Sequence, residues 1–224
     1  MKSRDRELIH FLDPENAIDG IVALGGPLTT TNLLRAYSRG IFPWPINEYI
    51  VPWCCPEERG ILQFDELHVP RRLERTRRNS SFDFTIDRAF VDVITHCATV
   101  RRKHESRTWI TRPMIRAYFE LHNEGHAHSV EVWEGSELVG GLYGVDAGGS
   151  FAGESMFTLR SDASKLALLF LIEHLKARGL GWIDIQMVTP HLEALGAKTI
   201  KRAEFLAQLA ATQKLNLTLF PRGV

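Results

Sequence analysis

Cysteine, excess charge and long apolar runs are all scarce in this sequence of 224 residues. Its three cysteines, Cys54, Cys55 and Cys97, are too few for a disulfide framework, and two adjacent ones could hardly share one tetrahedral zinc ion. The 27 basic and 27 acidic side chains cancel, so an anionic partner would need a local basic patch. No apolar run reaches the length of a membrane span, and the N-terminus lacks a signal-peptide core. We expect a reduced cytoplasmic protein without a metal or a membrane anchor.

The first sixty residues differ from the rest of the chain in proline content and in the regularity of their sequence pattern. They hold six of the ten prolines and one clear helix, residues 31–39, which opens at capping threonines and stops at Gly40. Such a proline-rich segment cannot build a large core alone, so we expect it to pack against the remainder of the chain. We predict a small N-terminal α/β domain over residues 1–62 and a second domain over residues 63–224.

Regular periodicities predict the elements of the second domain. They are a strand at 82–86, helices opening at Asp87 and Thr111, strands at 129–133, 138–145 and 150–157, a helix at 162–177, a strand at 182–186, a helical region at 190–211 and a strand at 215–219. This order resembles the GNAT acyltransferase fold. The expected fold class is α+β, with the small N-terminal domain packed on a GNAT-like acyltransferase domain that has a mixed, splayed central sheet.

Polar side chains interrupt two apolar strands of this predicted sheet. Glu154 lies in one strand, and Asp184 and Gln186 lie in the next. An unpaired polar group costs a few kcal/mol when it is buried, roughly 2–7 by transfer measurements, so such residues need a reason. One reading is that both polar faces are turned to solvent. The reading we favour is a shared site, with Asp184 and Gln186 on one face because they are two residues apart.

Coenzyme A chemistry is disfavoured by the loop that would hold its pyrophosphate. A helix N-terminus with close backbone approach binds phosphate well. Residues 158–165 contain no glycine, and they place Asp162 where the anion would lie.

Metal and serine chemistry are also disfavoured. His122, His126 and His128 straddle a glycine, which assures no common face, so capping or surface roles are favoured. Ser155 lies outside a nucleophile-elbow pattern and has no histidine tied to it.

Basic side chains are concentrated between residues 69 and 79. Only Glu74 opposes the five arginines there, which are Arg71, Arg72, Arg75, Arg77 and Arg78. Arg101, Arg102 and Lys103 add a second cluster. A solvated helix face is one explanation, and contact with nucleic-acid phosphates is the other. Arginine in place of lysine favours phosphate recognition slightly.

Ten short motifs, in one order over nearly the whole chain, carry a family resemblance. They are residues 24–26, 33–37, 40–44, 108–110, 127–131, 138–145, 153–157, 163–165, 183–186 and 195–197. With these motifs the chain resembles the leucyl/phenylalanyl-tRNA–protein transferases. The resemblance implies an enzyme that moves Leu or Phe, and also Met, from aminoacyl-tRNA to the N-terminal Lys or Arg of a protein or peptide. The product is marked for N-end-rule degradation, no cofactor is needed, and we expect a monomer.

The resemblance also implies roles for individual residues. Asp184 and Gln186 are the assigned catalytic pair, with Gln186 bonding the amine or ester, Asp184 orienting it and Glu154 joining their network. Trp53 and Trp109 would stack on or flank the terminal adenosine. The substrate side chain would lie in an apolar pocket made of Leu142, Phe151, Gly153, Met156, Leu171, Leu175 and Ile183. For the helix leucines, plain core packing is the competing explanation.

Two departures from the family pattern affect these expectations. Residues 53–56 read Trp-Cys-Cys-Pro where the family often has Trp-Trp-Ser-Pro. Leu171 and Leu175 stand where phenylalanine is frequent, which predicts a shifted side-chain preference. A coenzyme-A-dependent GNAT acyltransferase and a noncatalytic RNA-binding protein are the alternatives.

Overall fold

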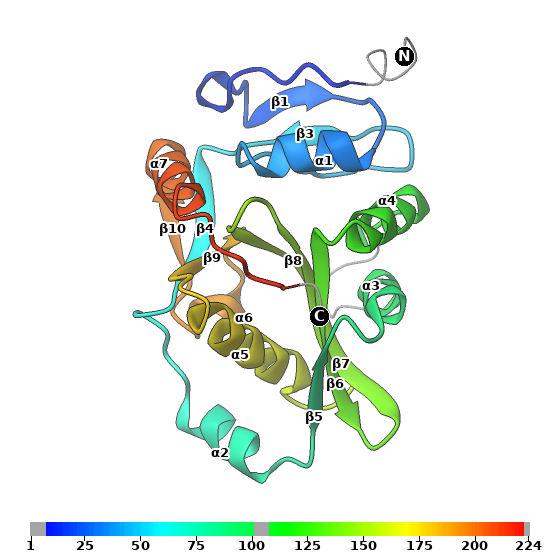
Figure 1. Cartoon of the computed structure of the whole chain (residues 1–224), viewed down its shortest axis with the longest axis vertical. Coiled ribbons are helices and arrows are strands. Elements are labelled where there is room, and N and C mark those ends of the chain that lie inside the picture. The colour runs from blue at the N-terminus through cyan, green and yellow to red at the C-terminus, as the bar shows by residue number, and fades with distance from the viewer. Residues whose placement is uncertain (1–7, 101–107, 222–224) are drawn as a thin grey trace.

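The computed structural model describes residues 8–100 and 108–221, so Arg101, Arg102 and Lys103 lie outside the described residues. Two sheets organise the chain, a small one at its N-terminal end and a large mixed one below it (Figure 1). Within the described ranges, no helix is long and apolar enough to cross a membrane. The α+β class expected from the sequence is confirmed at this level.

The N-terminal layer is a three-stranded antiparallel sheet with one helix and a short 3-10 turn. It comprises η2 (Pro14–Asn16), β1 (Ile21–Leu24), α1 (Thr30–Tyr37), β2 (Phe42–Pro43) and β3 (Pro52–Cys54), with sheet order β1-β3-β2. Helix α1 begins where the Thr29 hydroxyl accepts a hydrogen bond from the Asn32 amide. It ends before Gly40, whose φ of 72° suits a residue without a Cβ.

The large sheet has seven strands in the order β10-β4-β9-β8-β7-β6-β5. Its strands are β4 (Glu58–Gln63), β5 (Asp83–Ile86), β6 (Ala127–Glu134), β7 (Glu137–Asp146), β8 (Phe151–Thr158), β9 (Trp182–Gln186) and β10 (Lys198–Lys201). Every neighbouring pair is antiparallel except β8 and β9, which are parallel and register only at Ala152 and Asp184. The sheet is therefore mixed, and its two halves meet along a very short junction.

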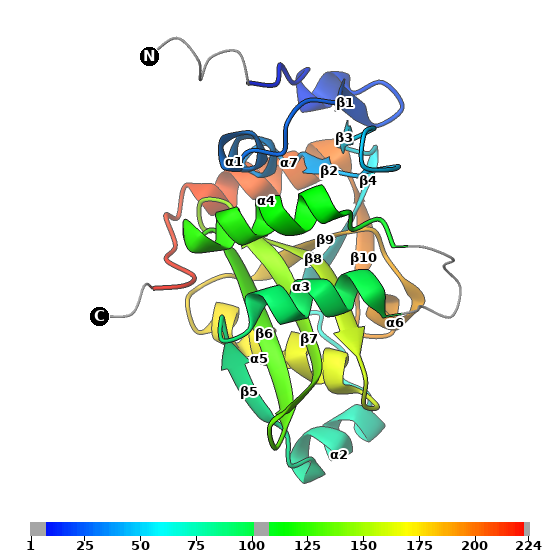
Figure 2. The same ribbon diagram turned by 90° about the vertical axis from the view of Figure 1, so that its right-hand side faces the viewer.

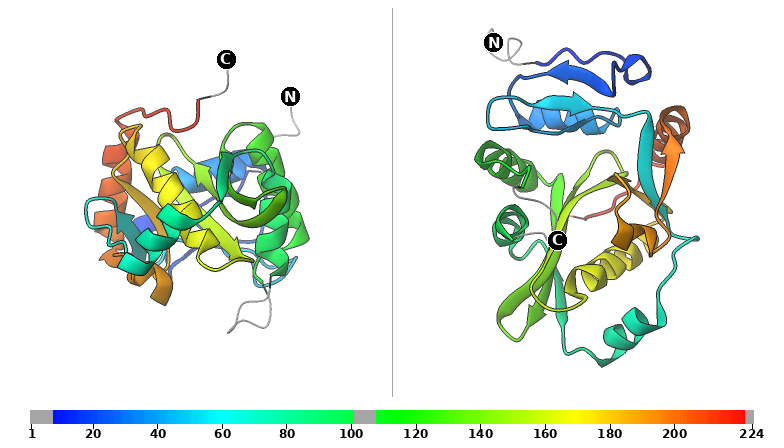
Figure 3. Two further views of the ribbon diagram at one scale, coloured as in Figure 1. Left: turned by 90° about the horizontal axis from the view of Figure 1, so that it is seen from below. Right: turned by 180° about the vertical axis from the view of Figure 1, so that it is seen from behind.

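Helices cover both faces of this sheet. Helices α3 (Phe90–Thr99) and α4 (Arg112–Asn123) pack on one face, and α5 (Ala163–Lys176) packs on the other (Figures 2 and 3). Helix α7 (Arg202–Gln213) covers β4 and β10, while α2 (Arg71–Asn79) lies at the far end from the N-terminal layer (Figure 1). The apolar core is divided accordingly, with one cluster under α3 and α4 and another under α5.

Two expectations for the C-terminal region are wrong. The helical region expected at 190–211 is split into α6 (Pro190–Glu193), β10 and α7. Gly196 breaks it with a φ of 99°, and an added Cβ would lie 2.5 Å from the Glu66 carbonyl oxygen. The strand expected at 215–219 does not form. Leu217 and the fully buried Leu219 pack into the α5 cluster without sheet pairing, whereas Leu215 is exposed.

The expected domain boundary between residues 62 and 63 falls inside β4. This strand pairs with both β10 and β9, so it is an interior strand of the large sheet. The polypeptide leaves the N-terminal layer at β3 and enters the large sheet at Glu58.

Candidate active site

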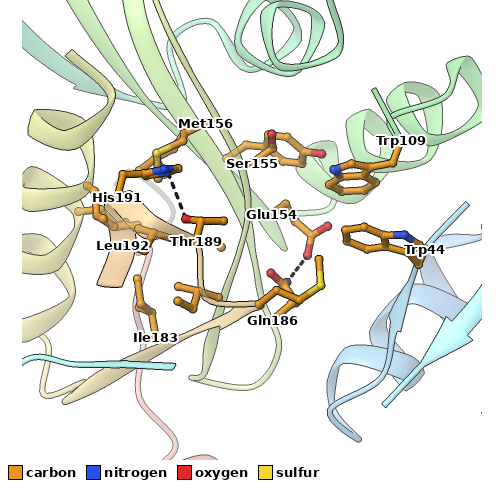
Figure 4. Close-up of a pocket in the computed structure, with 17 residues that line it drawn as sticks. Trp44, Trp109, Glu154, Ser155, Met156, Ile183, Gln186, Thr189, His191 and Leu192 are labelled. Carbon is orange, nitrogen blue, oxygen red and sulfur yellow. Dashed lines mark hydrogen bonds between the residues drawn. The ribbon is translucent and has the colours of Figure 1, made fainter. Parts of the chain in front are cut away.

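A cavity of about 400 Å³ opens where β8 and β9 diverge (Figure 4). It extends up to the N-terminal layer and is lined from β7, β8, α5, β9, α6 and residues beside them. Its lining residues are Trp44, Trp109, Leu142, Tyr143, Gly153, Glu154, Ser155, Met156, Leu168, Leu171, Ile183, Ile185, Gln186, Met187, Thr189, His191 and Leu192. The single register pair between β8 and β9 explains the opening, because the strands stop bonding each other just before Glu154 and Gln186.

One end of the cavity is apolar. Met156, Leu192 and Ile183 lie there (Figure 4). Leu142 from β7 and Leu168 and Leu171 from α5 add further apolar surface to the cavity lining. His191 is beside Met156 and Leu192 (Figure 4), with its Nε2 atom 3.4 Å from the Thr189 hydroxyl. This end offers a slot for an apolar side chain.

The other end carries two tryptophan rings, one from each layer of the molecule. Trp44 follows β2 in the N-terminal layer, and Trp109 precedes α4 (Figure 4). The rings stack with centroids 5.2 Å apart and planes 14° apart. They form an aromatic platform of the kind on which a nucleobase stacks.

A polar chain begins at Gln186 and Glu154, between these two ends (Figure 4), and continues into the core. Gln186 donates from Nε2 to Glu154 Oε1 at 2.9 Å, and the Tyr118 hydroxyl donates to Glu154 Oε2 at 3.1 Å. Tyr118 in turn bonds the hydroxyl of Tyr37 from α1. Burial raises the pKa of both tyrosines well above the ordinary value, so they remain donors.

Glu154 is the carboxyl group of the cavity lining, and its acid–base equilibrium is displaced toward the neutral form. Desolvation raises the pKa of its carboxyl from 4.5 to about 7, although the two tyrosine hydroxyls and Arg59 favour the ionised form. The side chain keeps partial exposure through the cavity itself. Near neutral pH, Glu154 therefore exchanges between its charged and neutral forms.

Asp184 lies behind the cavity and does not line it. The pairing of β4 with β9 shifts register between Gly60 and Ile61, and Gln186 has a φ of 56°. This bulge breaks the alternation expected of a regular strand, so the prediction that Asp184 and Gln186 share one face is wrong. Gln186 points into the cavity, whereas the Asp184 carboxylate bonds the Gln186 amide and the side chain of Arg59.

Six of the expected substrate-binding residues line the cavity. They are Trp109, Leu142, Gly153, Met156, Leu171 and Ile183. Phe151 and Leu175 do not, because both are buried in the α5 core cluster. The expectation that Trp53 would contact the terminal adenosine also needs correction, because Trp53 is fully buried. Its Nε1 atom donates to the Gly25 carbonyl at 2.9 Å, and its ring packs against Phe11.

Trp44 and Arg59 were not predicted from the sequence. Trp44 stands at the end of the motif at 40–44, so an aromatic residue in a loop between glycine and proline was the available signal. Arg59 offers no comparable signal, because a lone arginine in a strand normally faces solvent.

The histidines and cysteines that the structure describes do not gather into a metal site. His122 Nδ1 lies 2.8 Å from the Ala127 carbonyl, and His128 Nδ1 lies 2.7 Å from Asp87. Within residues 8–100 and 108–221, no cluster of three or more His, Cys, Asp or Glu could hold a metal ion.

The basic helix α2 has two kinds of arginine. Arg72 pairs with Asp162 at 3.4 Å, Arg77 pairs with Glu173, and Arg78 pairs with Glu74 at 3.7 Å. Arg71 and Arg75 are exposed and have no ion pair in the part of the chain that the structure describes. These two cations are the ones most available to a phosphate.

Two family models match this chain. A family model described as leucyl/phenylalanyl-tRNA protein transferase matches residues 61–210, and the model of the N-terminal domain of that transferase matches residues 26–57. Among solved structures, a functionally unknown conserved protein from Staphylococcus epidermidis ATCC 12228 is 8% identical with a TM-score of 0.43, over 64% of this chain and 57% of that one.

Relatives with the name leucyl/phenylalanyl-tRNA–protein transferase match most of the chain. That of Tolumonas auensis is 46% identical over 205 residues, which cover 90% of this chain and 87% of the relative. That of Syntrophobacter fumaroxidans is 48% identical, with 86% and 82% covered. That of Chromohalobacter salexigens is 51% identical, with 85% and 74% covered. The chain therefore belongs to the leucyl/phenylalanyl-tRNA–protein transferase family.

Proposed function

We propose that this aminoacyltransferase moves Leu or Phe, and also Met, from aminoacyl-tRNA to the N-terminal Arg or Lys of a protein. The observation that supports this most is one cavity with an apolar slot, a carboxylate–amide pair and a tryptophan platform in sequence along it. An aminoacyl ester has the same three parts: a side chain, a reacting carbonyl and the terminal adenosine.

The apolar slot fits the substrate side chain. Burying a leucine-sized group contributes about 2 kcal/mol, enough to favour Leu, Phe and Met over small or charged side chains. The terminal adenine would stack on the platform of Trp44 and Trp109, where base stacking is worth about 1–3 kcal/mol. The reacting carbonyl then lies near Glu154 and Gln186.

The reaction is the aminolysis of an ester. The nitrogen of the neutral α-amine attacks the carbonyl carbon, a C–N bond forms, the C–O bond to the ribose breaks, and the amine's proton passes to the leaving ribose oxygen. The ester is already activated, so positioning and proton management are the enzyme's tasks. Gln186 donates one N–H of its side-chain amide to Glu154. Its amide oxygen is then available to accept a hydrogen bond from an N–H of the attacking amine. Ionised Glu154 attracts the cationic acceptor.

The remaining features of the proposal rest on the same arrangement. We assign a GNAT-like architecture to the large sheet, with a domain boundary just before Glu58. A coenzyme A donor is disfavoured because Asp162, at the start of α5, bonds Lys165 and pairs with Arg72 where a pyrophosphate would lie. We expect a cytoplasmic monomer, since one chain supplies the whole cavity, and its products would enter N-end-rule degradation.

A transfer assay tests this function. Purified protein, labelled Leu-, Phe- or Met-tRNA and an Arg-initiated model protein are mixed without ATP or acetyl-coenzyme A, and label is followed into protein. We expect transfer of all three, with a preference shifted from that of a relative that has phenylalanine at the Leu171 position. No label in protein, with correctly folded enzyme, would refute the proposed function. Identical relative rates in the two enzymes would refute the shifted preference.

The exposed arginines of α2 are expected to contact tRNA phosphates. Arg75→Glu should raise the KM for Leu-tRNA, leave kcat unchanged and reduce the slope of log affinity against log salt by about 1. The matched control is Arg160→Glu, an exposed arginine whose partners are Glu134 and Glu137. Equal weakening in both variants would show a general charge effect in place of a specific contact.

A further inference from the structure

Arg59 is a fully buried cation at the junction of the two layers. Only 1% of its surface is exposed, and its guanidinium lies 4.5 Å from the Phe42 ring centroid and 4.4 Å from that of Phe205. A charge taken out of water is costly unless it is paired and hydrogen-bonded. Arg59 meets this condition with three bonds.

Two of these bonds occupy the carboxylate of Asp184. Arg59 Nε donates to Oδ1 at 2.8 Å, and Nη2 donates to Oδ2 at 2.6 Å. The amide of Gln186 donates to Oδ1 as well, at 2.9 Å. The guanidinium of Arg59 thus fixes the Asp184 carboxylate by a bidentate contact. The Asp184 carboxylate in turn accepts a hydrogen bond from the backbone N–H of Gln186, where φ is 56°.

The third bond reaches the N-terminal layer. Arg59 Nη1 donates to the Gly40 carbonyl at 3.0 Å. Gly40 and Phe42, which both contact Arg59, precede Trp44 in the same short segment. One side chain therefore contacts both the segment that carries the tryptophan platform and the carboxylate that fixes Gln186.

We propose that Arg59 is a positioning residue of the transfer reaction, which sets Gln186 and Trp44 at a fixed separation through Asp184 and Gly40. Asp184 then acts by holding the Gln186 backbone and receives no proton from the acceptor amine, because it lies outside the cavity and its oxygens are occupied. This inference rests on the proposed role of Gln186. The contact between Arg59 of β4 and Asp184 of β9 therefore helps to assemble the site.

Arg59→Lys tests the proposal, because lysine keeps the charge but lacks the planar fork. We expect kcat for Leu transfer to fall about tenfold or more, since a displacement of about 1 Å can cost 100-fold, while KM for Leu-tRNA changes less than about threefold. The double variant Arg59→Met/Asp184→Asn guards against misfolding. It removes both buried charges and keeps an acceptor for the Gln186 amide, so it should fold and show the same loss of kcat.

Arg202→Lys is the matched control. Arg202 also ties the large sheet's C-terminal helix to the N-terminal layer, donating to the Cys55 carbonyl at 3.1 Å and the Glu15 carbonyl at 3.2 Å, but it does not touch Asp184. It should lower the melting temperature without lowering kcat. Equal losses of kcat in Arg202→Lys and Arg59→Lys would overturn the proposal, as would wild-type kcat in the double variant.

The outcomes separate this inference from the role on which it rests. If Gln186→Gly is inactive while both Arg59 variants keep wild-type kcat, Arg59 is not a positioning residue and Gln186 retains its role. If Gln186→Gly is fully active, the proposed role of Gln186 fails, and the positioning role of Arg59 fails with it.

Discussion

Replacing Gln186 with glycine is expected to lower kcat for aminoacyl transfer about 100-fold while the protein remains folded. The side chain supplies the oxygen that orients the attacking amine, and its own N–H is held by Glu154 at 2.9 Å. Removing it leaves the amine free to adopt unproductive orientations. The measurement is single-turnover transfer from Leu-tRNA, with Leu-tRNA binding measured in parallel.

Glycine is the suitable replacement because of the backbone at this position. Gln186 has a φ of 56°, which glycine adopts without strain and alanine does not. The melting temperature should therefore not fall in Gln186→Gly. Gln186→Asn provides a second variant, since asparagine tolerates this conformation but withdraws the amide by one methylene. A kcat within about threefold of wild type in both variants would contradict the role, given losses of about 100-fold for comparable misplacements.

Replacing Glu154 with glutamine is expected to stabilise the protein above pH 7 and to slow transfer. The pKa of this carboxyl is raised from 4.5 to about 7, chiefly by desolvation. Between these values the folded state binds the proton more tightly than the unfolded state, so stability falls as pH rises through this window. This rise in the pKa of Glu154 lowers the free energy of unfolding above pH 7 by at most about 3 kcal/mol. Water in the cavity makes the loss smaller. Urea unfolding at pH 5 and pH 8 measures it.

The same substitution should reduce kcat/KM for an Arg-initiated acceptor about tenfold or more, because a charged partner of the cation is lost. The wild-type rate should rise with pH through about 7 as Glu154 ionises, and again as the acceptor amine loses its proton near pH 8, roughly its ordinary value. Glu154→Gln should abolish only the first rise.

Glu131→Gln is the matched control for this pH profile. Glu131 is also a buried carboxyl with a raised pKa, caused by desolvation, but it bonds Ser129 and Thr85 away from the cavity. Its variant should keep both rises. A Glu154→Gln enzyme that retains the rise near pH 7 would show that another group titrates there.

The helices and strands of the large sheet follow closely from local patterns. The alternation at 82–86, the apolar face opened at Thr111 and the meander at 129–157 all depend on neighbours in sequence, and each element forms close to its expected place. The prediction of one helical region at 190–211 is wrong because of contacts between segments distant in the sequence. A strand of four residues forms there because β4 presents it with an open edge.

The cavity shows the same division between local and nonlocal causes. Met156 and Ile183 were identifiable because their motifs carry the family pattern, and Leu171 was identifiable only by its position relative to the family's pocket. Leu175 shares the helix with Leu171, yet it lies in the core. Nothing in the spacing distinguishes these two leucines. The distinction depends on where α5 passes beyond the end of β9.

By itself, the sequence determined the family, the mixed α+β class and the placing of Glu154 and Gln186 on neighbouring strands, because each is written in short motifs. Only the tertiary structure decided that Trp44 and not Trp53 faces the cavity, and that Asp184 turns away to Arg59. Both outcomes depend on a bulge in β9 and on the seating of the N-terminal layer. These are contacts between segments that are distant in the chain, and residue spacing does not encode them.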